Sequence, residues 1–110
     1  MSNLPRRTRA RSLAAAPQIL RGAALREARQ ALGPDWRIVR RRRLEREYAF
    51  PDFRSALAFA NRVGRLAERL AHHPDLTISW GKVRLVSWTH SVGGLTTNDF
   101  RLAAGADRAL

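Results

Sequence analysis

The sequence predicts an α+β fold, a four-stranded antiparallel sheet with helices packed on one face. In the segments expected to be helical, apolar residues recur every three or four positions, and in those expected to be strands they alternate with polar residues. The segments follow one another in the order α-β-β-α-β-β-α, and short turns separate the strands of each pair, which favours hairpins. The 110 residues suffice for one domain with one core.

The first three elements are expected before residue 51. We expect a helix over residues 18–32, which a Gly-Pro pair then ends. Its apolar stripe consists of Ile19, Ala23, Ala24, Ala28, Ala31 and Leu32. Residues 36–39 predict a strand, and the arginines at 40–43 predict the exposed turn of a hairpin. The second strand covers residues 44–50, and one of its sides presents Leu44, Arg46, Tyr48 and Phe50.

The second helix has the clearest pattern in the sequence. Pro51 suits a first turn, and Asp52 can cap the free amides. The apolar face consists of Phe53, Ala56, Ala60, Val63, Ala67 and Leu70. Because the residue before a proline favours an extended backbone, Pro74 should leave His73 outside the helix.

A second hairpin and a last helix complete the fold. Residues 76–80 alternate and predict the third strand, and Gly81-Lys82 can form a two-residue turn with glycine first. Residues 83–89 form the fourth strand. The side chains expected to share one face of this hairpin are Ile78, Trp80, Val83 and Leu85. Thr96 begins the pattern T-x-x-D, a capping-box-like start with Asp99 at the third helical position, so a helix is expected over residues 98–108.

The net charge of +12 is concentrated at the start of the chain. Residues 1–46 hold 13 Arg and 3 acids, whereas residues 47–110 have a net charge of only +2. We expect residues 1–13 to form a basic flexible arm and residues 14–110 to form the domain. Arginine replaces lysine almost everywhere, which favours a solvated basic surface, so nucleic acid should bind only by nonspecific charge.

Composition excludes several classes of protein. There are no cysteines, so disulfides and thiolate chemistry are excluded. No apolar run approaches the ~18 residues of a membrane span. The Arg-rich start lacks the apolar segment of a secretory signal, although it has the look of an organelle transit peptide. We therefore expect a cytoplasmic protein.

The three histidines, His72, His73 and His90, all lie beside predicted breaks in secondary structure. Glu68 precedes His72 by one helical turn, and Asp99 could close over the same cleft. Histidine is the side chain best suited to proton transfer near neutral pH. The ordinary alternatives are a polar helix end, a surface salt bridge and a helix cap. Zinc is disfavoured because His72 and His73 are neighbours, so no metal is expected.

The motif Glu68-x3-His72-His73-Pro74-x5-Trp80-x9-His90-x8-Asp99 resembles that of the pterin-4a-carbinolamine dehydratase family. Further matching positions are Trp36, Leu44-x-Arg46-x-Tyr48-x-Phe50, Asp52-Phe53, Val83, Thr89-His90 and Gly93-Gly94-Leu95-Thr96. The resemblance covers about residues 18–108. It implies dehydration of 4a-hydroxytetrahydropterin to quinonoid dihydropterin, which recycles the cofactor of aromatic amino acid hydroxylases. It also implies no cofactor, and dimers joined through sheet edges, often paired into tetramers.

The resemblance also implies roles for individual residues. His72 and His90 would exchange protons with the pterin, and His73 would hold it. Glu68 would orient and charge His72. The other residues expected to bind the substrate are Trp88, Thr89, Ser91 and Asp99, of which Thr89 and Asp99 could instead bind the catalytic histidines. Two residues depart from the family: Ala71 stands where many members have an acidic or polar residue, and Ser91 replaces a frequent Asp or Glu.

A binding role is the alternative. Some relatives act as dimerisation cofactors of a homeodomain transcription factor, and others as assembly factors for RuBisCO. Relatives that have lost catalysis tend to lose the paired histidines, and His72 and His73 are both present here. The sequence therefore favours the enzyme.

Overall fold

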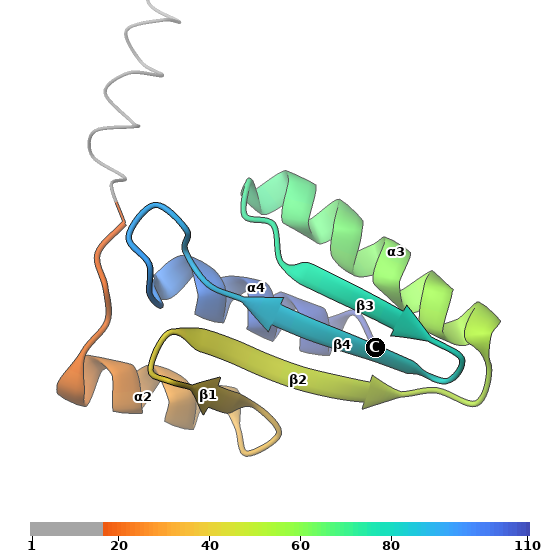
Figure 1. Cartoon of the computed structure of the whole chain (residues 1–110), viewed down its shortest axis with the longest axis horizontal. Helices are drawn as coiled ribbons and strands as arrows, with labels where there is room; N and C mark the ends of the chain where they lie inside the picture. The colour runs from red at the N-terminus through yellow and green to blue at the C-terminus, as the bar shows by residue number, and fades with distance from the viewer. Residues whose placement is uncertain (1–16) are drawn as a thin grey trace, which may run out of the picture.

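The computed structural model describes residues 17–110, so the arm expected at residues 1–13 lies outside the described residues. It confirms the α+β fold and the α-β-β-α-β-β-α order (Figure 1). The helices and strands are α2 (Gly22–Leu32), β1 (Arg37–Val39), β2 (Arg43–Ala49), α3 (Phe53–Leu70), β3 (Asp75–Ser79), β4 (Lys82–Ser87) and α4 (Thr97–Arg108).

The four strands form one antiparallel sheet in the order β1-β2-β4-β3. The predicted alternation of β2 is confirmed, because Leu44 and Tyr48 are buried on the helix side while Glu47 is exposed on the other. α3 and α4 lie behind the sheet in Figure 1 and pack against each other. The largest side chains that are fully buried include Trp36, Phe59, Leu85 and Leu102.

α3 begins and buries one face largely as predicted. The carboxylate of Asp52 accepts a hydrogen bond from the Ser55 amide at 2.8 Å, and this bond lowers the pKa of Asp52. The buried face of the helix comprises Ala56, Phe59, Ala60, Val63 and Ala67. Phe53 was expected on that face, but 46% of its surface is exposed because it lies in the first turn, at the end of the sheet.

The first helix is shorter than predicted, and a different stripe, only partly buried, packs against the core. It begins at Gly22, because the amide of Leu20 donates to the Leu95 carbonyl at 2.8 Å and keeps the preceding segment out of the helix. Leu25, Ala28 and Leu32 pack against the core. The expected stripe is therefore wrong for Ala23, Ala24 and Ala31, which are exposed.

The turn between β3 and β4 lies one residue earlier than predicted. Ser79 pairs with Lys82, so the two turn residues are Trp80 and Gly81. A Cβ at Gly81 would lie 2.9 Å from the carbonyl oxygen of Phe50, so this close approach requires glycine. As a result Trp80 leaves the face expected for it and is 74% exposed.

Asp107 joins α4 to the sheet. Its carboxylate accepts hydrogen bonds from Trp36 Nε1 at 2.9 Å, from Tyr48 at 2.6 Å and from Arg46 at 2.8 Å. Burial, followed by the adjacent Asp107 carboxylate, raises the pKa of Tyr48 far above its usual range. This cluster holds the C-terminal end of α4 against β2.

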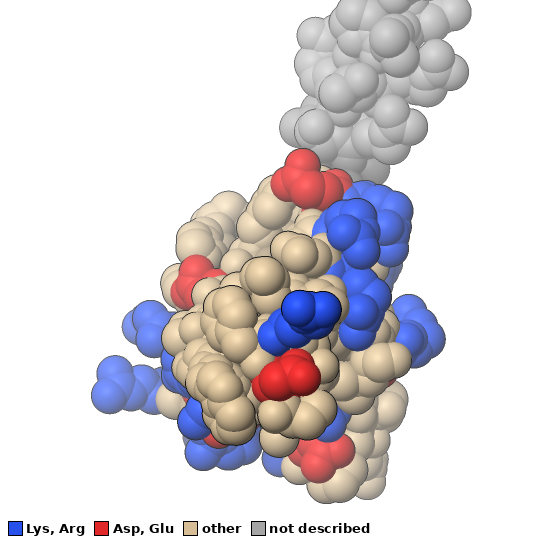
Figure 2. All heavy atoms as spheres, turned by 90° about the vertical axis from the view of Figure 1, so that its right-hand side faces the viewer, with Lys and Arg blue, Asp and Glu red and all other residues tan. Residues whose placement is uncertain are grey.

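Basic side chains outnumber acidic ones on the face seen in Figure 2, and acidic groups lie among them. None of the helices in residues 17–110 has the length and apolar character needed to cross a bilayer.

Candidate active site

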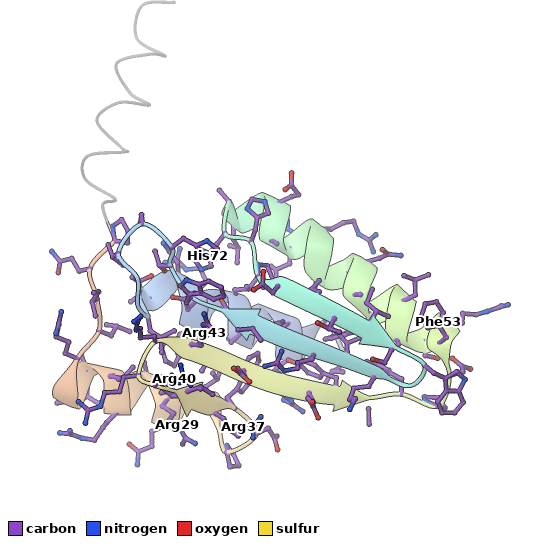
Figure 3. The ribbon with its side chains drawn as sticks, in the orientation of Figure 1. Arg29, Arg37, Arg40, Arg43, Phe53 and His72 are labelled. Atoms are coloured by element: carbon purple, nitrogen blue, oxygen red, sulfur yellow. The ribbon has the colours of Figure 1, made fainter. Side chains whose placement is uncertain are left out.

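The three histidines line one pocket, whose volume is about 380 Å³. Its lining consists of Pro17, Ala71, His72, His73, Trp88, Thr89, His90, Ser91 and Asn98. His72, labelled in Figure 3, and His73 come from the segment that follows α3. His90 comes from the segment that follows β4. Two segments distant in the sequence thus bring three imidazoles to one place.

The end of α3 explains how His72 and His73 reach the pocket. Ala71 adopts a left-handed conformation, with φ 52° and ψ 41°, and so ends the helix immediately before the histidines. Such a conformation costs an alanine about 1–2 kcal/mol. Pro74 then favours an extended backbone at His73, which lies outside the helix as predicted.

Asp99 is completely buried and holds His72. Its Oδ1 atom lies 2.6 Å from His72 Nε2 and accepts a hydrogen bond from Ser87 at 2.6 Å. Its Oδ2 atom accepts hydrogen bonds from Thr89 at 2.8 Å and from the Thr96 amide at 2.9 Å. The last bond belongs to the predicted capping box, which is confirmed. Four partners occupy the acceptor capacity of a carboxylate, so Asp99 can act on the pocket only through His72.

The donor and the acceptor in each hydrogen bond between the hydroxyl groups around Asp99 can be assigned. Thr89 donates its single hydroxyl proton to Asp99. Its contact with the Thr96 hydroxyl, at 2.8 Å, must therefore use a proton of Thr96. No buried side-chain nitrogen or oxygen within residues 17–110 lacks a hydrogen-bond partner. The network consequently fixes Asp99, and Asp99 fixes His72.

Glu68 contacts His73 rather than His72, so the expected pairing is wrong. Its Oε2 atom lies 2.5 Å from His73 Nε2. The pairing changes because the left-handed Ala71 interrupts the helical spacing that would have placed His72 one turn above Glu68. Both members are largely exposed, with side-chain exposures of 76% for Glu68 and 63% for His73. This exposed pair therefore contributes less to stability than the buried His72–Asp99 pair.

His90 is held by stacking. Its ring lies 4.1 Å from the ring of Trp88, at an interplanar angle of 19°. The guanidinium of Arg43 lies over the Trp88 ring, 4.6 Å from its centroid, which is a cation–π geometry. Trp88, which the resemblance places among the substrate-binding residues, lines the pocket. Arg43 was missed because nothing in a run of four arginines distinguishes it.

The remaining predicted residues divide into two groups. Thr89 and Ser91 line the pocket, although the Thr89 hydroxyl is already engaged by Asp99 and Thr96. Glu68 and Asp99 are absent from the lining and each contacts one histidine. In the part of the chain that the structure describes, no three His, Asp or Glu side chains gather as metal ligands do.

Comparison with known proteins identifies relatives along most of the chain. A family model described as Pterin 4 alpha carbinolamine dehydratase matches residues 18–109. A protein of Chlorobium limicola, provisionally named pterin-4-alpha-carbinolamine dehydratase, is 55% identical over 74 residues, covering 64% of this chain and 66% of that protein. A protein of Alkaliphilus metalliredigens with the same provisional name is 43% identical over 77 residues, covering 70% and 69%. The matched segments thus span about two thirds of the length of each of these relatives.

Two solved structures share the fold. A transcriptional coactivator/pterin dehydratase from Brucella melitensis superposes with a TM-score of 0.78 at 30% identity, over 84% of this chain and 98% of that one. A pterin dehydratase-like protein identified as a RuBisCO assembly factor in the alpha-carboxysome has a TM-score of 0.58 at 20% identity, over 71% and 92%. The second likeness shows the fold alone.

Proposed function

The chain belongs to the pterin 4 alpha carbinolamine dehydratase family, and from this premise we propose that it removes water from 4a-hydroxytetrahydropterin to form quinonoid dihydropterin. The supporting observation is the convergence of His72, His73 and His90 on one pocket. In a cell this reaction would recycle the pterin cofactor of an aromatic amino acid hydroxylase.

The proposed reaction needs two proton transfers. The hydroxyl on C4a leaves as water after it receives a proton, and the proton on N5 passes to a base. Imidazole can perform either step near neutral pH, and each such step typically contributes 10²–10⁴-fold in rate. We assign these two transfers to His72 and His90.

His72 is suited to proton transfer by its partner. Its Nε2 atom faces Asp99, which leaves Nδ1 as the ring nitrogen that can exchange a proton with the pterin. The Asp99 carboxylate stabilises the imidazolium that forms when Nδ1 accepts a proton. Asp99 is therefore a positioning residue in this proposal. Trp88 positions His90 in turn, because stacking between the two rings fixes the plane of the imidazole.

His73 has the role of holding the substrate. Its Nε2 atom is engaged by Glu68, and the ring is largely exposed at the pocket rim. This solvated pair suits contact with a polar edge of the pterin better than it suits proton transfer, because no buried group fixes the position of His73. Ser91 and Trp88, which also line the pocket, would contribute further contacts.

We also propose that the protein forms a homodimer, or a tetramer of paired dimers, through the edge of its sheet. β3 is an edge strand, so one side of its backbone is available to pair with another strand. Two exposed apolar side chains, Ile78 and Trp80, lie on or next to this strand. Strand pairing between two copies would satisfy the backbone and cover these side chains.

A dehydration assay tests the activity. The purified full chain should accelerate loss of water from a synthetic 4a-hydroxytetrahydropterin by more than tenfold over the spontaneous rate at neutral pH. Dehydration at the spontaneous rate would overturn the proposal. It would favour a binding role instead, in line with the Brucella relative described as a transcriptional coactivator.

A further inference from the structure

A second pocket, with a volume of about 730 Å³, lies beside the start of α2. Three segments enclose it: residues 19–26, the turn between β1 and β2, and the Gly93-Gly94 loop. Figure 1 shows that turn next to the first turn of α2. This pocket shares no lining residue with the histidine pocket.

The charge of this pocket is entirely positive. Its charged lining residues are Arg21, Arg26, Arg41 and Arg42, and none of the Asp or Glu residues in the described part of the chain lines it. Within residues 17–110, none of these four arginines forms a salt bridge, whereas Arg37, Arg46 and Arg84 each pair with an acid. Four like charges around one cavity repel one another, and an anion bound between them would relieve that repulsion.

The walls of the pocket reinforce this electrostatic arrangement. Arg40 and Arg41 in the β1–β2 turn are held at φ 54° and 59°, in the left-handed region that glycine or asparagine would adopt more readily, and Arg41 lines the pocket. The start of α2, which also lines the pocket, has no side-chain cap and no acidic residue in its first turn, so the helix dipole adds positive potential.

The pocket is also shaped before any ligand arrives. The Leu20–Leu95 backbone hydrogen bond, at 2.8 Å, fixes the segment that leads into α2. A Cβ at Gly94 would lie 3.3 Å from Ile19 Cδ1, which shows how closely the loop packs against that segment. A preformed concave site favours a compact anion, whereas an extended polyanion would need a continuous basic surface.

We propose that this pocket binds a pyrophosphate group, either as free inorganic pyrophosphate or as part of a nucleoside di- or triphosphate. Guanidinium groups form bidentate hydrogen bonds with phosphoryl oxygens, so four of them match a ligand with two phosphoryl groups. The exposed amides of the first turn of α2 would add donors.

Calorimetric titration of the full chain at physiological ionic strength tests the proposal with inorganic phosphate, inorganic pyrophosphate and ATP. Pyrophosphate should bind more tightly than phosphate. The double variant Arg41→Gln/Arg42→Gln and the single variant Arg26→Gln, which lie on different walls, should each weaken pyrophosphate binding, the double variant by about tenfold or more. The control Arg54→Gln/Arg101→Gln removes the same charge from arginines outside the lining and should change binding by less than about twofold.

Each arm of the titration has a decisive reading. If ATP binds more tightly than pyrophosphate and loses affinity in the same variants, the ligand is a nucleotide. If ATP and pyrophosphate bind with equal affinity, the phosphate chain is the recognised group. Equal weakening by the control and the pocket variants would overturn the proposal. A single-stranded oligonucleotide that outcompetes pyrophosphate and responds equally to both sets of variants would also overturn it, because that pattern is nonspecific. Thermal unfolding confirms that each variant remains folded.

Discussion

His72 Nε2 lies 2.6 Å from Asp99 Oδ1, and this contact joins two residues that are 27 positions apart in the chain. It links the segment after α3 to the first turn of α4. Because Asp99 also caps α4 and accepts hydrogen bonds from Ser87 and Thr89, one buried carboxylate positions a helix, a strand end and an imidazole together. The stability of α4 and the orientation of His72 thus depend on the same residue.

Asp99→Asn should lower kcat by about ten- to a hundredfold while KM changes by less than about threefold. The amide cannot stabilise an imidazolium, and its NH2 group can force the wrong tautomer on His72. Steady-state kinetics measures the split, and Asp75→Asn, on exposed β3, is the control. A rise in KM alone would contradict the positioning role of Asp99.

His73→Gln should raise KM by about tenfold with a smaller change in kcat. Glu68→Gln should raise KM by less than about threefold, because exposed ion pairs contribute little. If His73→Gln instead abolished kcat at saturating substrate, His73 would be a proton-transfer residue and its assignment here would be wrong.

Trp88→Leu should reduce kcat by about tenfold, because His90 loses the ring that fixes its plane. Arg43→Gln should have a smaller effect in the same direction, since Arg43 acts only through Trp88. Arg40→Gln, in the same run of arginines, is the matched control. If Trp88→Leu were as active as the unaltered protein, the stack between Trp88 and His90 would not contribute to the reaction.

Tyr48 should make the folded state lose stability at high pH. Its pKa in the folded protein is raised above the ordinary tyrosine value of 10.0, so unfolding releases a proton once the pH exceeds that value. The contribution is complete below about pH 10 and falls as the pH rises further. Denaturant unfolding of the unaltered chain and of Tyr48→Phe, compared from pH 8 to pH 11, measures it. Parallel curves for the two proteins would show that Tyr48 is not held protonated.

Ile78→Lys should weaken self-association, because a charge on β3 disfavours pairing between sheet edges. Sedimentation velocity should show the unaltered chain as a dimer or tetramer and the variant shifted to a lower mass. Leu57→Lys, on an exposed position of α3, is a control for adding charge to another apolar side chain. An unchanged assembly in Ile78→Lys would place the interface elsewhere.

Local patterns were sufficient to predict most of the fold. The period of α3, the alternation of β2 and the T-x-x-D motif all depend on neighbours in the sequence, and the structure confirms them. The start of α2 depends instead on a tertiary hydrogen bond between Leu20 and Leu95, which periodicity cannot reveal. The β3–β4 turn was displaced by one residue because the close contact of Gly81 with Phe50 sets the register.

Motif spacing predicted the three histidines of the candidate pocket, but it predicted neither the pairings of these histidines nor the whole lining. Motif spacing located His72, His73 and His90, and the structure brings all three to one pocket. The pairing of Glu68 follows from the left-handed Ala71, a conformation that no local pattern indicates for alanine. Arg43 reaches Trp88 because Leu44 pairs with Ser87 across β2 and β4, and such a register is a property of the assembled sheet.

The most direct test of the account is the rate at which the double variant His72→Ala/His90→Ala dehydrates a synthetic 4a-hydroxytetrahydropterin, compared with the unaltered chain. Each single variant should be slower by about tenfold or more, and the double variant should approach the spontaneous rate while remaining folded. Full activity in the double variant would contradict the assignment of proton transfer to these two imidazoles.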